Sequence, residues 1–334
     1  MSETTLSNNK GIKDNIFGWA EKNLHVVLPL GLLLILVVFM GIIAPRFLSP
    51  INLIRVARAA SVYIILSVGM TFVITSGGID LSIGSTLGLT SVVMGAFVMD
   101  QMLNPYMGML FSVVFGMVLG LFIGILIAYV KVPPFIATIA MMASYRGLAL
   151  VHSAGEVRYG FPEPIIWLGQ GSLFGIPAPI IVAILIAVFG HILFVHTRFG
   201  RYCTAIGGNE EAARRAGIPV ARYKMLVYVF MAALAGFGGV VLTGRLDGTQ
   251  AVLGDAMELH VIASVIIGGT SLFGGRGSIV GSVIGALILG LVANALVLLR
   301  VEWFWQRVAE GVIVILAVMF NMWREKKLKE MMSN

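Results

Sequence analysis

The sequence predicts an all-α polytopic membrane protein, and three observations agree on that class. Of the 334 residues, 58% are hydrophobic and only 12% are charged, whereas soluble domains carry about 25% charged residues. The apolar residues gather in runs, most of which have the about 20 residues that a helix needs to cross a bilayer. The basic residues stand between these runs and at the two ends. We expect about ten transmembrane helices with broken or re-entrant segments, and both termini in the cytoplasm.

The apolar runs define a single membrane domain at residues 24–323, between a cytoplasmic tail at 1–23 and a basic cytoplasmic tail at 324–334. In chain order the runs are 24–44, 56–75, one that ends at 98, 107–130, 134–151, 179–195, 225–242, 259–267, 279–299 and 304–322. The run at 259–267 is too short to span alone, so we expect residues 255–269 to contribute.

The distribution of lysine and arginine tests this arrangement. With both termini inside, 15 of these residues fall at cytoplasmic positions and six at outer positions. Such an excess of positive charge is typical of the cytoplasmic side. The segment 197–224 is therefore expected to be a cytoplasmic loop, and 152–178 the longest periplasmic loop.

The cytoplasmic loop at 197–224 contains six basic residues and only two acidic ones. Asn209 can cap a short helix whose first turn carries Glu210 and Glu211, which complement the helix dipole, and Gly217 can end it. We therefore expect a short, capped, charged helix that faces the cytoplasm and that a soluble partner could hold.

Glycine pairs interrupt two of the apolar spans, at 77–84 (GGIDLSIG) and 268–281 (GGTSLFGGRGSIVG). Glycines loosen a membrane helix, and serine or threonine hydroxyls can satisfy the backbone groups that are freed. The two segments are either an internal repeat or two hairpin turns of similar composition. Asp80 either stabilises an inner gate by accepting backbone N–H bonds or is a plain cap at the membrane interface. The residues predicted at the inner gate or along the path are Gly77, Gly78, Asp80, Ser82, Arg276 and Asn294.

Several functions lack their motifs. The sequence contains no His-Glu-x-x-His, no Gly-x-Ser-x-Gly and no P-loop, so we expect neither an enzyme, nor a metal site, nor ATP hydrolysis by this chain. No nucleic-acid partner is expected, because the basic residues do not gather on one compact domain. An ion-coupled transporter needs ionisable groups deep in its spans. Arg307 and Glu310 are the best such pair, as a gate, a proton relay or an interfacial ion pair. The spans mainly carry Gly, Ser, Thr and a few amides, which suits a neutral, hydroxylated solute.

Four stretches carry a resemblance to a known family. They are GMTFVITSGGIDLSIGS (69–85), PPFIATIAMM (133–142), TRFGRYCTAIGGNEEAARRAGI (197–218) and IASVIIGGTSLFGGRGSIVGSVIGALILG (262–290). In order and spacing the chain resembles the membrane permease subunit of bacterial ribose-type sugar ABC importers, whose members serve ribose, xylose, galactose, allose, inositol or autoinducer-2. The resemblance covers nearly the whole chain.

The resemblance implies an inner-membrane permease that imports a neutral sugar by alternating access. The implied partners are a cytoplasmic ABC ATPase that carries ATP and Mg²⁺, a periplasmic sugar-binding protein, a second permease copy, identical or paralogous, and membrane lipid. No cofactor is expected in this chain.

The short cytoplasmic helix is similar to the coupling helix with which such permeases contact their ATPase. The resemblance assigns this contact to Gly208, Asn209, Glu210, Glu211, Ala212, Ala213, Arg214, Gly217 and Ile218. Glu163 and Asp247 are candidates for docking the binding protein through charge pairs, although both could lie in solvated loops. The alternatives are an ABC permease for branched-chain amino acids and an ion-coupled secondary transporter.

Overall fold

The structure is a computed structural model that describes residues 24–44 and 46–333, and it confirms the all-α class. The predicted tail at 1–23 lies outside the described residues. Each of the ten predicted apolar runs is a helix. These helices are α2 (Leu24–Ile43), α3 (Pro50–Thr75), α4 (Ile83–Met99), α5 (Pro105–Ala128), α6 (Pro134–Ser153), α8 (Ala178–His196), α11 (Val220–Leu246), α12 (Met257–Ile267), α13 (Ile279–Leu298) and α14 (Trp303–Ser333). Helix α14 continues through most of the segment predicted as a tail.

Seven of these helices are long and apolar enough to cross a membrane, namely α3, α5, α6, α8, α11, α13 and the first two thirds of α14. The apolar part of α2 (Val27–Ile43), together with α4 and α12, is shorter. Helices α4 and α12 adjoin the two glycine-rich segments, which agrees with the prediction that these spans are broken.

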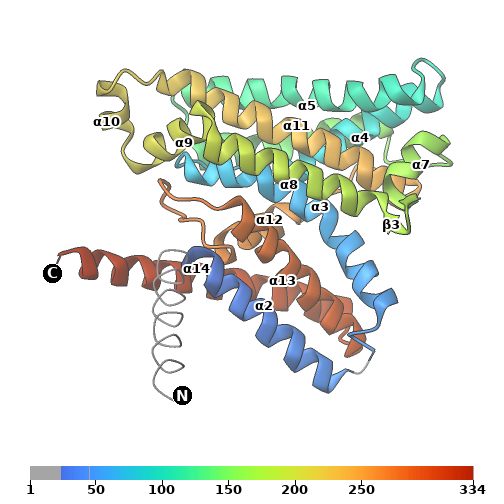
Figure 1. Ribbon diagram of the computed structural model, residues 1–334. Coiled ribbons are helices and arrows are strands. Elements are labelled where there is room, and N and C mark those ends of the chain that lie inside the picture. Colours follow the sequence, from blue (N-terminus) through green and yellow to red (C-terminus); the bar gives the residue numbers. More distant parts are fainter. Residues whose placement is uncertain (1–23, 45, 334) are drawn as a thin grey trace.

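The remaining elements form the two ends of the bundle. At one end lie α9 (Arg198–Gly208) and α10 (Glu210–Arg215), and at the other lie α7 (Glu163–Gln170) and β3 (Ile176–Pro177) (Figure 1). Strand β3 pairs with β2 (Ser172–Leu173), and β1 (Arg158–Tyr159) pairs antiparallel with β4 (Gly248–Thr249). The C-terminal end of α14 points toward the α10 end (Figure 1).

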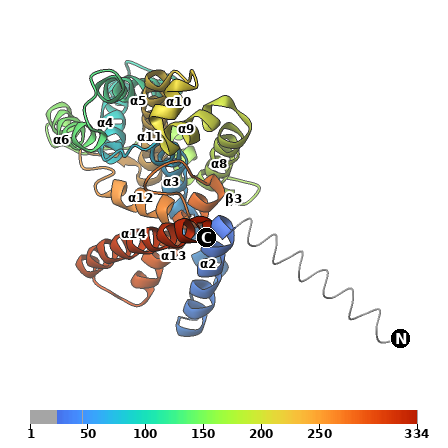
Figure 2. The ribbon, with the colours of Figure 1, turned by 90° about the vertical axis from the view of Figure 1, so that its left-hand side faces the viewer.

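The helices form a larger and a smaller group. Helices α4, α5, α6, α8 and α11 gather in the larger group with α3, while α2, α13 and α14 lie on the other side of α12 (Figure 2). Helix α3 is buried along most of its length and contacts both groups, because it packs against α8, α11, α12 and α13. It is the central helix of the protein.

Close backbone packing joins α5 to α11. Gly116, Gly120 and Gly124 of α5 lie directly against backbone carbonyls of α11, so a side chain at any of them would collide with that helix. The Ser112 hydroxyl donates a hydrogen bond to the Gly236 carbonyl across the same contact, at 2.9 Å. Small residues at four-residue spacing allow membrane helices to approach in this way, since lipid supplies no hydrophobic force between helices.

A segment at 248–256, which begins with β4 and continues in successive turns, runs along α4 and leads into α12. Its Thr249 hydroxyl lies 3.0 Å from that of Ser91, and Gly254 packs against the backbone of Gly84 near the start of α4. Arg146 of α6 donates to two carbonyls of the segment, including that of Leu253 at 2.9 Å. The segment therefore places the start of the eleven-residue helix α12 beside α4.

Candidate coupling site and inner gate

The predicted cytoplasmic helix is present as α10. The Asn209 side chain accepts a hydrogen bond from the Ala212 amide at 2.9 Å and caps the helix. Gly217 follows its end with a φ of 81°, in the left-handed region that glycine adopts readily. The first turn is acidic and the last turn is basic, so the charges complement the helix dipole at both ends.

Glu210 forms two ion pairs, one within α10 and one that attaches α10 to α11. Its carboxylate accepts hydrogen bonds from Arg214, at 2.8 Å within α10, and from Lys224 in the first turns of α11. The hydrogen bond from Lys224 holds the pKa of Glu210 below its ordinary value, with further help from the charges of Lys131 and Arg214. The contact with Lys224 therefore ties α10 to α11.

Helix α10 has an inner and an outer face. Ala213 is only 5% exposed and packs in a small cluster with Ile206 and Val220. It therefore positions the helix rather than offering a contact to a partner. Glu211 has a side chain that is 74% exposed, and Ala212 is also exposed. The other predicted coupling residues on the exposed surface are Gly208, Asn209, Arg214 and Gly217, while Glu210 and Ile218 are partly buried.

Three backbone segments meet beside α9, and we call this contact the glycine junction. It consists of residues 75–77 at the end of α3, 207–208 at the end of α9, and 274–277 between α12 and α13. The Gly275 amide donates to the Thr75 carbonyl at 2.9 Å. A Cβ atom on Gly207 would overlap that carbonyl oxygen and lie 2.7 Å from the Gly275 nitrogen. A Cβ atom on Gly274 would lie 2.8 Å from the Gly207 carbonyl oxygen and 3.1 Å from the Gly77 nitrogen. The junction joins the loop that carries α10 to both broken segments.

Asp80 holds the turn between α3 and α4. It is 1% exposed, and its Oδ1 accepts hydrogen bonds from the Ser82 amide at 2.8 Å and the Ser82 hydroxyl at 2.6 Å. Asp80 thus accepts a backbone N–H, as predicted, and its role as part of an inner gate or as a plain cap stays a prediction. Gly78 allows the Tyr228 hydroxyl to lie against the same turn, where it donates to the Ile79 carbonyl at 3.4 Å.

The structure does not bring Asn294 together with the other predicted gate residues. Its amide forms a reciprocal pair with that of Asn52, with N–O distances of 2.8 and 2.9 Å. Asn52 is in the first turn of α3 and Thr75 ends that helix, so the pair lies about 35 Å from the glycine junction at 1.5 Å per residue. Arg276 is exposed in the turn between α12 and α13, beside the junction.

The two candidate docking residues lie at the end of the bundle opposite α10. Glu163 begins α7 and is exposed. Asp247 ends α11, and its carboxylate accepts a hydrogen bond from the Phe161 amide at 2.9 Å. This bond gives Asp247 a structural role in tying the outer loop to α11. Docking through either residue stays a prediction.

Sequence reasoning missed the backbone contacts of Gly207 and Thr75. It also missed the partners of the charged residues Arg307 and Glu310. Gly207 stood inside a quoted motif, but nothing in the local sequence reveals which backbone it touches. Arg307 and Glu310 do not pair with each other as supposed, because Arg307 faces Asp255 at 3.6 Å and Glu310 faces His260 at 3.7 Å. Glu258 in the first turn of α12 was also not singled out. Its position, an acid at the start of a short apolar run, is the sequence signal by which it could have been recognised.

Comparison with known proteins places the chain in a family. Residues 52–320 match the family described as the permease component of the branched-chain amino acid transport system. The chain is 42% identical over 295 residues to a ribose import permease protein of Bacillus subtilis (strain 168), covering 86% of this chain and 90% of that protein. The corresponding protein of Escherichia coli (strain K12) is 39% identical over 293 residues, covering 86% and 91%.

An L-arabinose transport system permease protein of Escherichia coli (strain K12) is 36% identical over 329 residues, covering 98% of each chain. No solved structure matches the chain. The predicted resemblance to sugar permeases is therefore confirmed, and the family is one of transport components rather than enzymes. The chain belongs to this family of bacterial permease components and is a multi-pass protein of the inner membrane.

Proposed function

We propose that the chain is the membrane-spanning subunit of an ATP-driven ABC importer for a neutral sugar of the ribose class. The glycine junction is the observation that carries this proposal. Through direct backbone contact it joins both broken segments to the end of α9, which leads into the exposed helix α10. Such an arrangement suits a permease that receives its energy from outside the membrane, at α10, and uses it to rearrange the inner mouth.

The backbone atoms of the glycine junction are in close contact, with no free space between the three segments. Atoms already in contact cannot absorb a displacement, so a movement of α10 and α9 must shift the backbone at 75–77 and 274–277. Transport then requires that the ATPase in its different nucleotide states binds the two permease conformations with different free energies.

The proposal includes partners outside this chain. A separate cytoplasmic ATPase would hold ATP and Mg²⁺ and contact the exposed face of α10, whose Glu211, Ala212 and Arg214 are accessible. A sugar-binding protein would dock at the opposite end, near α7, and a second permease copy, identical or paralogous, would complete the assembly. The similar proteins named as ribose import and L-arabinose transport permeases support a sugar as the cargo.

Charge reversal at Glu211 tests the coupling role. Glu211→Lys is expected to leave the protein folded in the membrane but to abolish ATP-driven sugar uptake, because a partner contact on α10 would become repulsive. Arg215→Gln is the matched control, since it breaks the Glu211–Arg215 ion pair without changing Glu211. Uptake of radiolabelled D-ribose, D-xylose, L-arabinose and L-leucine would be measured in cells that carry the complete system. Normal sugar uptake by Glu211→Lys would rule out the coupling assignment.

A purification experiment tests the partnership itself. The tagged chain would be isolated in gentle detergent from cells that express its neighbouring genes, and its partners identified by mass. We expect a stoichiometric ATPase that is lost on changing Glu211 or Arg214. Active transport by a chain that retains no ATPase in any detergent, and that a proton ionophore abolishes at constant ATP, would favour the secondary transporter instead.

A further inference from the structure

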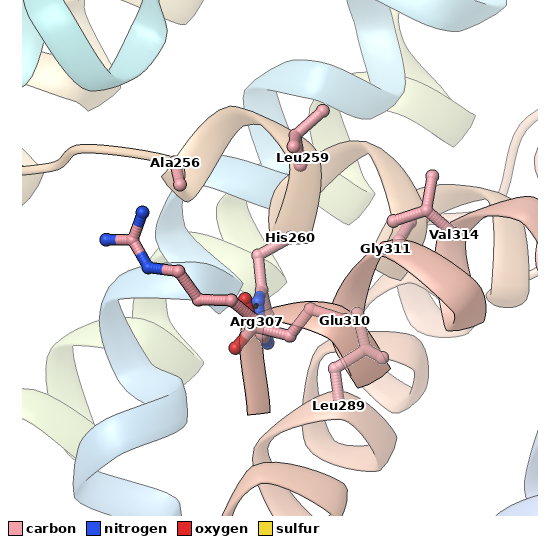
Figure 3. A pocket seen from close by; sticks show the side chains of 9 residues that line it. Ala256, Leu259, His260, Leu289, Arg307, Glu310, Gly311 and Val314 are labelled. Carbon is pink, nitrogen blue, oxygen red and sulfur yellow. Dashed lines mark ion pairs between the residues drawn. The ribbon is translucent and has the colours of Figure 1, made fainter. Parts of the chain in front are cut away.

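A pocket of about 140 Å³ lies between α12, α13 and α14, away from the glycine junction. Its polar lining consists of His260, Arg307 and Glu310, and its apolar lining includes Leu259, Leu289 and Val314. Figure 3 shows the Glu310 carboxylate beside the His260 ring, while the Arg307 guanidinium reaches toward Ala256 at the start of α12. The pocket is smaller than the about 300 to 1,000 Å³ of a site for drug-sized ligands, so it suits a small solute.

The polar groups of the pocket keep unused hydrogen-bonding capacity. The closest approach of Glu310 to His260 is 3.7 Å, and that of Arg307 to Asp255 is 3.6 Å. Both distances exceed those of hydrogen bonds. His260 is only 9% exposed, and its Nε2 has no hydrogen-bond partner among the described residues. A buried polar atom without a partner is costly, so a molecule in the pocket would supply what the protein does not.

The position of the pocket argues that it faces a polar passage rather than lipid. Glu310 lies two turns inside α14, and His260 is buried in the first turn of α12. The ring of Tyr63 from the central helix α3 packs on that of His260, with centroids 4.6 Å apart. Ionisable residues at such depth turn toward the interior of the bundle or a water-filled cavity, because lipid cannot solvate them.

We propose that this pocket binds the transported solute, and that the solute is a neutral sugar of pentose size; the proposal rests on the proposed function. A sugar offers hydroxyl groups that can donate to Glu310 and accept from Arg307. Its C–H faces can pack on Leu259, Leu289 and Val314. The pocket does not call for a charged solute, because the Arg307 guanidinium already faces the Asp255 carboxylate and the Glu310 carboxylate already faces the His260 ring. Hydroxyl groups can bind both without separating these pairs.

Protection of an introduced cysteine measures whether sugar occupies the pocket. Gly311 lines it, and a Cβ atom there would meet nothing within 4 Å, so Gly311→Cys places a thiol in open space. The chain has a single native cysteine, Cys203, which is buried and serves as the background in the unmodified protein. The assembled importer would be treated with a methanethiosulfonate reagent during ATP turnover. We expect saturating D-ribose to slow the labelling several-fold and L-leucine to leave it unchanged.

Two further variants separate binding from structure. Adding Glu310→Gln to Gly311→Cys is expected to abolish the protection by ribose. Adding Glu302→Gln, an exposed acid just before α14 and outside the pocket, is expected to preserve it. Glu310→Gln alone should lower the maximal ribose uptake about ten-fold, as expected for losing a hydrogen bond to a charged group. Glu302→Gln should leave both ribose uptake and the ATPase activity stimulated by the loaded binding protein unchanged.

The outcomes distinguish the two proposals. If ribose is transported but does not protect the cysteine, and Glu310→Gln transports normally, the pocket is not the solute site and the proposed function stands. If no sugar is transported and L-leucine is, the proposed function itself fails. Protection by ribose that Glu310→Gln removes and Glu302→Gln retains would establish the site.

Discussion

Replacing Gly207 with alanine should separate the three segments of the glycine junction. The new Cβ atom would overlap the Thr75 carbonyl oxygen and lie 2.7 Å from the Gly275 nitrogen, whereas ordinary contact begins at 3.4 Å. The Gly275 nitrogen must therefore move away by about 0.7 Å, and the Thr75 carbonyl oxygen, which is closer, must move further. Such overpacking costs about 1–3 kcal/mol, and losing the hydrogen bond from Gly275 to Thr75 adds about 1 kcal/mol.

The expected loss is as large as the coupling that the junction would transmit. Coupling free energies between two sites are about 1–3 kcal/mol. The free-energy cost of Gly207→Ala at the junction is of the same size, so this change should cancel most of the coupling. We expect a protein that inserts and assembles but imports at least about ten-fold less ribose per ATP hydrolysed, since each 1.4 kcal/mol corresponds to about a factor of ten. The assay is simultaneous measurement of uptake and ATP hydrolysis in proteoliposomes that contain the complete importer.

Two glycine variants serve as controls for this experiment. Gly147→Ala lies within α6, where a Cβ atom would meet nothing within 4 Å, so it should transport normally. Gly208→Ala would meet nothing closer than the Gly275 Cα at 3.9 Å. An equal defect in Gly207→Ala and Gly208→Ala would point to the ATPase contact or to helix propensity rather than to the junction. Wild-type coupling in Gly207→Ala would refute the reasoning outright.

Three other predictions concern stability, pH and reactivity. Asn52→Ala should destabilise the protein by about 1–3 kcal/mol, because it leaves the Asn294 amide without its reciprocal partner. Thermal unfolding in detergent, applied to a double-mutant cycle of Asn52 and Asn294, measures the interaction free energy of the pair. Additive effects of the two single changes would contradict the prediction. The pKa of Glu210 is lowered in the folded protein, chiefly by the hydrogen bond from Lys224. The ionised form of Glu210 therefore stabilises the fold at pH values above the ordinary carboxyl pKa. This contribution to the free energy of unfolding is lost as the pH falls through the lowered pKa. The protection of the α10 amides against hydrogen exchange should therefore not change between about pH 6 and 8, where Glu210 stays ionised and bound to Lys224. Loss of protection in that range would contradict the lowered pKa of Glu210. Burial raises the pKa of the Cys203 thiol to about 12, so the folded protein should resist maleimide labelling at neutral pH until it is denatured, and rapid labelling would show that α9 opens.

The sequence predicted the positions of the helices well because the membrane imposes a simple physical requirement. A span must be apolar for about 20 residues, and each of the ten predicted runs corresponds to a helix. The cap of α10 was equally predictable, since Asn209, the acidic first turn and Gly217 act within a few residues of one another. Local rules of this kind need no knowledge of the rest of the fold.

The candidate gate was predicted only in part. Glycine pairs marked both broken segments, but they did not show that Gly207 lies between them. Asn294 was grouped with the gate because it is a polar residue in a span, and the structure pairs it with Asn52 at the other end of α3. Ala213 was assigned to the partner contact from its motif, whereas its side chain packs inward.

The sequence by itself determined the class of the protein, the order of its apolar helices, and the short, capped, charged helix between two of them, because hydropathy and capping are properties of neighbouring residues. Only the tertiary structure decided which distant segments touch. The glycine junction unites residues near positions 75, 207 and 275, and the pocket unites His260 with Glu310. Contacts across such separations depend on how whole helices pack against one another, and glycines or isolated charges in the sequence do not specify their partners.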